Sequence, residues 1–162
     1  MDLDQQIQSL IDKAPPDGST PQILKAIAPA LLLLAQQLKH LEYSILQTFE
    51  QSWAITVLSN LKQPGREKRV IYAFPSLQDA SLAATAAGDR AKRPVSMPVT
   101  HILFQMLALE GLDSIVFFET PGNLEVGTEV RREQVQNLIN VYLQQYRSTP
   151  QSSSNNLPPN IA

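Results

Sequence analysis

The side chains best suited to catalysis or metal binding are few and widely spaced. The two histidines of the 162-residue chain are His40 and His101, and neither has a second histidine or a carboxylate at the spacing of a metal site. We interpret both as surface or capping residues. The chain has no cysteine, which excludes disulfides, thiol nucleophiles and thiolate metal sites. We therefore expect no metal centre and no cofactor.

Acidic and glycine-rich patterns give no catalytic signature either. Asp79 follows the capping hydroxyl of Ser76, a position where a carboxylate stabilises the first turn of a helix. No neighbour of Asp79 in the sequence suggests general acid–base chemistry. Residues 122–127 hold two glycines five positions apart, but the lysine of a phosphate-binding loop is missing. A serine nucleophile motif is also absent, so we expect a non-enzymatic protein.

Basic residues gather in the middle of the chain. Residues 62–93 carry seven basic against three acidic side chains, a net charge of +4, whereas residues 1–61 and 94–162 carry −3 each. If the two loops that hold these charges meet in space, they form a patch for an acidic partner; the alternative is a solvated surface. No aromatic residues interleave with them, which disfavours nucleic acid. The seven residues are Lys62, Arg66, Lys68, Arg69, Arg90, Lys92 and Arg93.

A β-hairpin is expected at the centre of the fold. Residues 53–59 and 69–74 are rich in apolar and aromatic side chains, and Pro64-Gly65 marks a turn between them. Both segments carry apolar groups on both faces, so we expect both faces of the sheet to be at least partly covered.

A leucine-rich stripe precedes the hairpin. Apolar residues recur at alternating intervals of three and four between residues 24 and 45. Pro29 should kink or break this helix near residue 28, so we expect a short helix at 21–28 and a longer one at about 30–50. The stripe is either a coiled-coil or dimer seam, or the face on which the helix lies against its own chain. The residues that a seam would present are Leu31, Leu34, Leu38 and Leu41.

The rest of the pattern predicts a mixed α+β fold. We expect a helix at 3–14, a helix after Ser76, an exposed basic loop at 88–96, a helix from Pro98, a strand at 114–118, a short strand at 124–126 and a helix at 128–146 capped by Thr128.

These elements make one domain at 1–147, with a helical first third (1–50) and a sheet-containing part (51–147). Its sheet should have three to four strands packed by helices. Residues 148–162 are rich in Ser, Pro and Asn and are expected to be a disordered tail. We expect a soluble cytoplasmic protein, since there is no signal-peptide pattern and the longest apolar run, about ten residues, is too short to span a membrane.

Part of the chain resembles a known family. A helix leads into a strand at 49–58, a strand leads through an aromatic residue into a helix start at 70–80, and a proline-led helix leads to a strand ending in Pro-Gly at 97–122. In this order the elements resemble the N-terminal domain of SseB-like proteins over about half the chain. The chain departs from that family at Pro75, where threonine is usual, and at Thr120, where asparagine is usual. The resemblance implies a small α/β domain with a mostly antiparallel or mixed sheet, and it brings no catalytic residues.

Our expectations about function therefore rest on the predicted surfaces of the protein. We expect an interaction or assembly protein that docks a protein partner, or a second copy of itself as a homodimer, through the leucine-rich helix at 21–50 and the basic loops. One alternative is a small-ligand binder or enzyme with a site at the strand ends near Asp79, Arg90 and Thr120. The other is a nucleic-acid-binding protein that uses the basic loops, with an affinity that falls steeply as salt rises.

Overall fold

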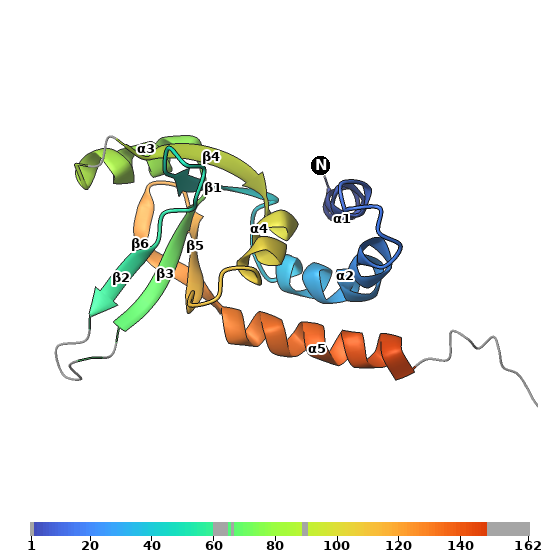
Figure 1. Ribbon diagram of the computed structural model, residues 1–162. Coiled ribbons are helices and arrows are strands. Elements are labelled where there is room, and N and C mark those ends of the chain that lie inside the picture. Colours follow the sequence, from blue (N-terminus) through green and yellow to red (C-terminus); the bar gives the residue numbers. More distant parts are fainter. Residues whose placement is uncertain (1, 60–64, 66, 89–90, 149–162) are drawn as a thin grey trace, which may run out of the picture.

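The protein is a mixed α+β fold. Its structure is a computed structural model that describes residues 2–59, 65, 67–88 and 91–148. Within these residues there are five helices and a six-stranded mixed sheet (Figure 1), so the expected fold class is confirmed and the expected three to four strands were too few. The elements are α1 (Leu3–Asp12), α2 (Thr20–Gln36), β1 (Glu42–Gln47), β2 (Thr56–Ser59), β3 (Glu67–Phe74), α3 (Leu77–Ala86), β4 (Arg93–Pro98), α4 (Val99–Met106), β5 (Ser114–Thr120), β6 (Asn123–Arg131) and α5 (Arg132–Ser148).

β3 is the strand on which the sheet is built. The strands lie in the order β4-β1-β3-β5-β6, and β2 also pairs with β3. β3 and β5 run parallel, and the other named pairs run antiparallel. A parallel pair needs a long crossover, which here contains α3, β4 and α4. The expected hairpin is confirmed as the antiparallel pair of β2 and β3, although β2 begins only at Thr56.

β1 and β2 share one edge of β3. β1 pairs with the C-terminal end of β3. If β1 continued past Leu46 in the same register, Thr48 would lie opposite Val70. Thr56 lies there instead, so residues 48–55 are an insertion outside the ladder. This β1–β2 insertion folds back on β1, where Trp53 forms an isolated antiparallel bridge with Gln47.

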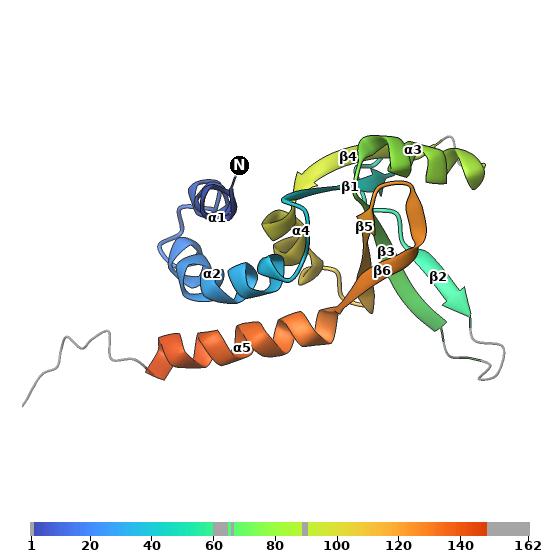
Figure 2. The ribbon, with the colours of Figure 1, turned by 180° about the vertical axis from the view of Figure 1, so that it is seen from behind.

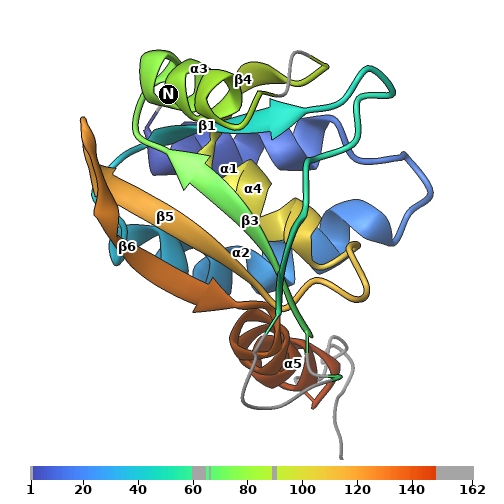
Figure 3. The same cartoon turned by 90° about the vertical axis from the view of Figure 1, so that its left-hand side faces the viewer.

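The two faces of the sheet are covered unequally. Ile45, Ile71 and Phe117 point to one face and join the main core with residues of α1, α2, α4 and α5; Figure 3 shows α1, α2 and α4 behind the sheet on this helical face. On the opposite face, which we call the α3 face, Phe74 and Phe118 pack in a smaller cluster with α3. α3 covers only the upper part of that face (Figures 1 and 3).

The helix starts follow the local sequence signals. At α1, Asp2 accepts a hydrogen bond from the Gln5 backbone N–H at 2.8 Å, and the Gln5 side chain accepts one from the Asp2 N–H at 3.0 Å. This reciprocal capping box satisfies two backbone donors. At α3, the Ser76 hydroxyl accepts from the Asp79 N–H at 3.1 Å. The helices expected at 3–14 and after Ser76 are confirmed by these elements.

α2 differs from its expected form. It continues through Pro29 instead of breaking there. A proline inside a helix costs roughly 3 kcal/mol or more, which the full burial of neighbours such as Ile27 and Leu31 offsets. The helix runs alongside α5 at the base of the molecule (Figures 1 and 2).

The expected second half of the leucine helix is wrong. Residues 42–47 form β1, not the end of a helix at 30–50. Leu41 and Ile45 continue the helical spacing, but Tyr43 and Ile45 also fit the period of two of a strand. The pairing of β1 with both β3 and β4 favours the strand period over the helical one. The local sequence does not indicate that pairing.

Two further boundaries were misplaced. The second part of the basic loop expected at 88–96 is replaced by β4, which begins at Arg93 and pairs with β1. The helix expected at 128–146 begins only at Arg132, because β6 stays paired with β5 as far as Arg131 and takes in Thr128. The Arg132 guanidinium then donates to the carbonyls of Met106 at 3.2 Å and Leu107 at 2.5 Å, which caps the C-terminal end of α4.

Gly127 of β6 gives a first testable prediction. A Cβ atom there would lie 2.7 Å from Val116 Cγ1 and 3.1 Å from the Phe117 carbonyl oxygen. Gly127→Ala should therefore lower the free energy of unfolding by about 1–3 kcal/mol, measured by urea denaturation. Val126→Ala, at an exposed position on the same strand, should change it by less than about 0.5 kcal/mol. Equal effects of the two substitutions would contradict the close packing.

Candidate functional site

A buried carboxylate organises the chain between α2 and β1. The Tyr43 hydroxyl donates a hydrogen bond to Glu119 Oε1, and the Lys39 N–H donates to Glu119 Oε2 at 3.1 Å. The His40 N–H donates to the Tyr43 hydroxyl at 3.2 Å, and His40 Nε2 lies 2.6 Å from the Glu119 carbonyl oxygen. Burial, and then the contact with Glu119, raises the pKa of Tyr43 well above its usual value. We call these residues the Glu119 cluster.

The Glu119 cluster combines histidine, tyrosine and carboxylate, but the carboxylate oxygens, the tyrosine hydroxyl and one ring nitrogen of His40 already have partners within the protein. Both carboxylate oxygens accept hydrogen bonds from the protein, and the His40 ring contacts backbone. The cluster therefore fastens the segment after α2 to the end of β5. Sequence reasoning missed it and placed His40 on a helix. The signal was available in β5, where Glu119 continues the buried alternation of Ile115 and Phe117.

A second buried polar cluster joins α1 to α4. Gln6 is fully buried, and its side-chain NH₂ donates to the Leu41 carbonyl oxygen at 2.9 Å. Its side-chain oxygen accepts from Thr100 N–H at 3.1 Å and from the Thr100 hydroxyl at 2.8 Å. His101 Nε2 lies 3.1 Å from the Gln6 carbonyl oxygen, and burial lowers the pKa of His101. These contacts hold α1 and α4 together and leave His101 as a packing residue.

Part of the predicted strand-end site does come together. Both Asp79 oxygens accept from the Gly122 N–H, at 3.2 and 3.3 Å, in the turn that follows Thr120. The Ser76 hydroxyl donates to the same carboxylate at 3.0 Å. Asp79 is therefore engaged in tying α3 to this turn. Arg90, the third predicted member, lies outside the described residues.

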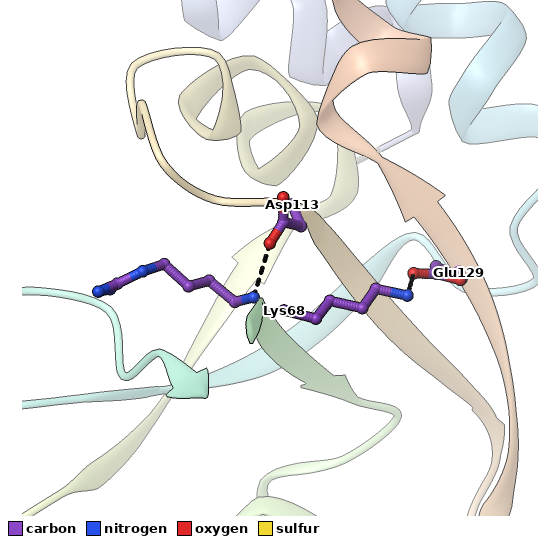
Figure 4. A network of polar contacts seen from close by, with 4 residues as sticks. Lys68, Asp113 and Glu129 are labelled. Atoms are coloured by element: carbon purple, nitrogen blue, oxygen red, sulfur yellow. Dashed lines mark hydrogen bonds and ion pairs between the residues drawn. The ribbon is translucent and has the colours of Figure 1, made fainter. Parts of the chain in front are cut away.

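The described basic residues do not form one patch. Lys68 forms an ion pair with Glu129 of β6, which lowers the pKa of Glu129, while the Arg69 N–H donates to Asp113 at 2.7 Å (Figure 4). The starts of β3 and β4, which carry Lys68 and Arg93, lie well apart in both Figure 1 and Figure 3. Lys62, Arg66 and Arg90 lie outside the described residues. The guanidinium groups of Arg69 and Arg93 have no hydrogen-bond or ion-pair partner within the part of the chain that the structure describes.

The leucine stripe is used mainly inside the protein. Leu31, Leu34 and Leu38 are buried in the main core. Leu34, which is 3% exposed, also lines a shallow 540 Å³ groove between α2 and α5. Leu41 alone of the four stripe residues is exposed, by 49%. This favours the interpretation that the stripe lies on its own chain, and three of the four leucines are not available to a partner here.

Exposed apolar side chains concentrate instead around β2. Phe49 is 80% exposed and Val57 and Leu58 are 43% exposed each, with Ile55 close behind. β2 pairs with β3 on one side, and no described strand pairs with its outer side. An unpaired edge presents N–H and C=O groups that can hydrogen-bond to another strand. We call this the β2 edge.

A pocket lies beside the β2 edge on the α3 face. It has a volume of 230 Å³ and is partly open to solvent. On the sheet side it is lined by Tyr72 and Phe74, and on the helix side by three alanines of α3 and its end. We call it the α3 pocket. The alanines of the helix side are Ala83, Ala84 and Ala87, and Leu46, Ala54, Thr56 and Lys92 also line the pocket.

Comparison with known proteins adds no assignment. No protein-family model matches the chain, and the search of the curated proteins gave no match. The resemblance to SseB-like domains and the cytoplasmic location stay predictions from sequence. Among the described helices none is long and apolar enough to cross a membrane, and no three metal-ligating side chains in the same residues are placed to share an ion.

The Glu119 cluster gives a second prediction. Tyr43→Phe leaves a buried carboxylate oxygen without its donor and should lower the free energy of unfolding by about 1–3 kcal/mol. Tyr142→Phe is the matched control, because the Tyr142 hydroxyl has no hydrogen bond to any described residue; it should be near neutral in urea denaturation. If the two variants are equally stable, Tyr43 does not anchor Glu119.

The raised pKa of Tyr43 also predicts a pH dependence. Above about pH 10 the tyrosine ionises in the unfolded chain but stays neutral in the fold. The contribution of Tyr43 to the free energy of unfolding is fully present below about pH 10 and is lost progressively as the pH rises from there towards the higher pKa that Tyr43 has in the fold. The wild type should therefore lose more stability than Tyr43→Phe between neutral pH and strongly alkaline pH.

Proposed function

We propose that the protein is a non-enzymatic binding module that takes up an extended segment of a partner protein along the β2 edge. The observation that carries the proposal is an uncharged strand with two exposed apolar side chains, Val57 and Leu58, whose outer side is paired by no strand among the described residues. In this mode of recognition the backbone hydrogen bonds supply affinity, and side-chain pockets supply specificity.

The comparison with β6 supports the choice of edge. β6 is also an outer strand, and it carries Glu125, Glu129 and Arg131. Charged side chains on an edge discourage pairing with other chains. β2 consists of Thr, Val, Leu and Ser and has no such protection.

The space beside β2 is in line with an existing strand. β4 pairs with the outer side of β1 and begins at Arg93, opposite Gln47. β2 lies along the edge of β3 beyond the point where β4 begins. A strand added to the outer side of β2 would therefore lie end to end with β4. Arg93 would stand at one end of that strand, and Arg69 lies opposite Val57 on the other side of β2.

Charge indicates what the partner carries. Arg69 and Arg93 have no ion pair within the described residues, and both belong to the segment with a net charge of +4. An acidic segment complements them. A second copy of the protein would bring the same arginines to the interface, so a partner segment is favoured over a homodimer through β2.

The alternatives have weaker support. The titratable groups of the Glu119 cluster and Asp79 are engaged by the protein's own backbone and side chains, which disfavours an enzyme that uses them. Nucleic-acid binding needs a continuous basic surface, and Lys68 is already paired with Glu129. The leucine-rich helix serves in this proposal as scaffold.

The experiment is a selection of random peptides displayed against the purified protein. We expect enrichment of extended sequences that alternate apolar and acidic residues, with NMR amide shifts on binding that centre on Thr56–Ser59. Val57→Glu should weaken binding by about tenfold or more, since it places a like charge on the edge. Val126→Glu, at a valine on β6 that is also exposed (70% against 43% for Val57), is the control and should leave binding unchanged.

Two results would contradict the proposal. One is a selection that enriches no peptide of this kind. The other is binding that Val126→Glu weakens and Val57→Glu does not.

A further inference from the structure

The size of the α3 pocket suits one ring. A cavity of about 150 Å³ in another protein accepts benzene, whereas sites for drug-sized molecules measure about 300–1,000 Å³. The α3 pocket, at 230 Å³, lies between these values. It has room for a single six-membered ring with a small substituent, the size of one aromatic side chain.

The lining suits an aromatic ring. On the helix side Ala83, Ala84 and Ala87 offer only methyl groups, so nothing long fills the space from α3. On the sheet side the rings of Tyr72 and Phe74 each lie 5.6 Å from that of Phe118. Aromatic rings favour offset or edge-to-face contacts at such separations, and a guest ring would add one more member to this group.

Two hydroxyl groups and the side chain of Lys92 are the polar elements of the pocket lining. Thr56 and Tyr72 line it, and neither hydroxyl has a hydrogen-bond partner among the residues that the structure describes. Each can donate or accept. A phenol group would meet these hydroxyls, whereas a plain phenyl group would leave them without a partner on the guest.

Thr56 connects the pocket to the β2 edge. It is the first residue of β2 and its side chain also lines the pocket. In an added strand, the residue beside Thr56 points to the same face of the sheet, with its Cβ about 5 Å away. That side chain therefore starts next to the pocket.

We propose that the α3 pocket receives a tyrosine side chain of the extended acidic segment that pairs with the β2 edge, and that this tyrosine is the segment's specificity anchor. The inference rests on the proposed function. Buried aromatic anchors of this kind dominate the energy of many interfaces.

The test separates the pocket from the edge by using two probes. The first is p-cresol, the side-chain analogue of tyrosine, followed through the alanine and threonine methyl resonances of isotope-labelled protein. We expect millimolar binding that shifts the methyls of Ala83, Ala84, Ala87 and Thr56 and leaves that of Ala30, buried in the main core, unchanged. Toluene, which lacks the hydroxyl, should bind more weakly.

The second probe is the tightest peptide from the selection described above. Replacing its tyrosine by alanine should weaken binding by about tenfold or more, and replacing it by phenylalanine should weaken binding less. Ala87→Leu, which fills the pocket from an exposed helix end, should abolish the benefit of the tyrosine. Ala86→Leu is the matched control on the same helix, outside the pocket lining. Thr56→Val should remove the preference for tyrosine over phenylalanine.

The outcomes distinguish the two proposals. A peptide that binds at β2 but ignores both its tyrosine and Ala87→Leu overturns the pocket assignment and leaves the edge intact. If p-cresol binds and no peptide does, the proposed function fails, and with it the anchor role of the pocket. Methyl shifts away from the α3 pocket would also overturn the assignment.

Discussion

The pairing of β3 sets the layout of the molecule. One side of β3 is matched by β5, whereas the other is shared between β1 at its C-terminal end and β2 at its N-terminal half. The β1–β2 insertion at 48–55 follows from this sharing, because the chain leaves the ladder and returns in a shifted register. Backbone N–H and C=O groups in a sheet need hydrogen-bond partners or water. β4 supplies such partners to β1 but does not extend alongside β2. The β2 edge is thus a consequence of how β3 is shared.

Buried polar groups fix the helical layer to this sheet. Glu119 holds the segment after α2, and Gln6 joins α1 to α4 and to the Leu41 carbonyl. These contacts use the groups that would otherwise invite a catalytic interpretation. On the α3 face, α3 covers the sheet with alanine side chains. Small side chains on one element leave space that larger ones would fill, which accounts for the α3 pocket.

Local signals predicted much of the fold, and long-range pairing accounts for the rest. The cap at Ser76, the start of α1 and the β2–β3 pair follow from short patterns in the sequence. β1 was missed since Ile45 fits both the helical and the strand period, and only its pairing with β3 and β4 decides. The site was harder to predict. The exposed residues of β2 belong to a strand that the sequence predicts. The sequence does not indicate which side of that strand is unpaired, because this depends on where β4 begins. Arg69 was named as a candidate from charge, whereas the α3 pocket needed positions from three strands and a helix.

The outer side of β2 should be open in the free protein, and amide hydrogen exchange can measure this residue by residue. In an antiparallel pair, alternate residues direct their N–H groups to the partner strand and away from it. At low protein concentration, therefore, alternate amides within Thr56–Ser59 should exchange rapidly while those facing β3 are protected. Protection of all the β2 amides in the free monomer would show that the edge is already covered and would contradict the account.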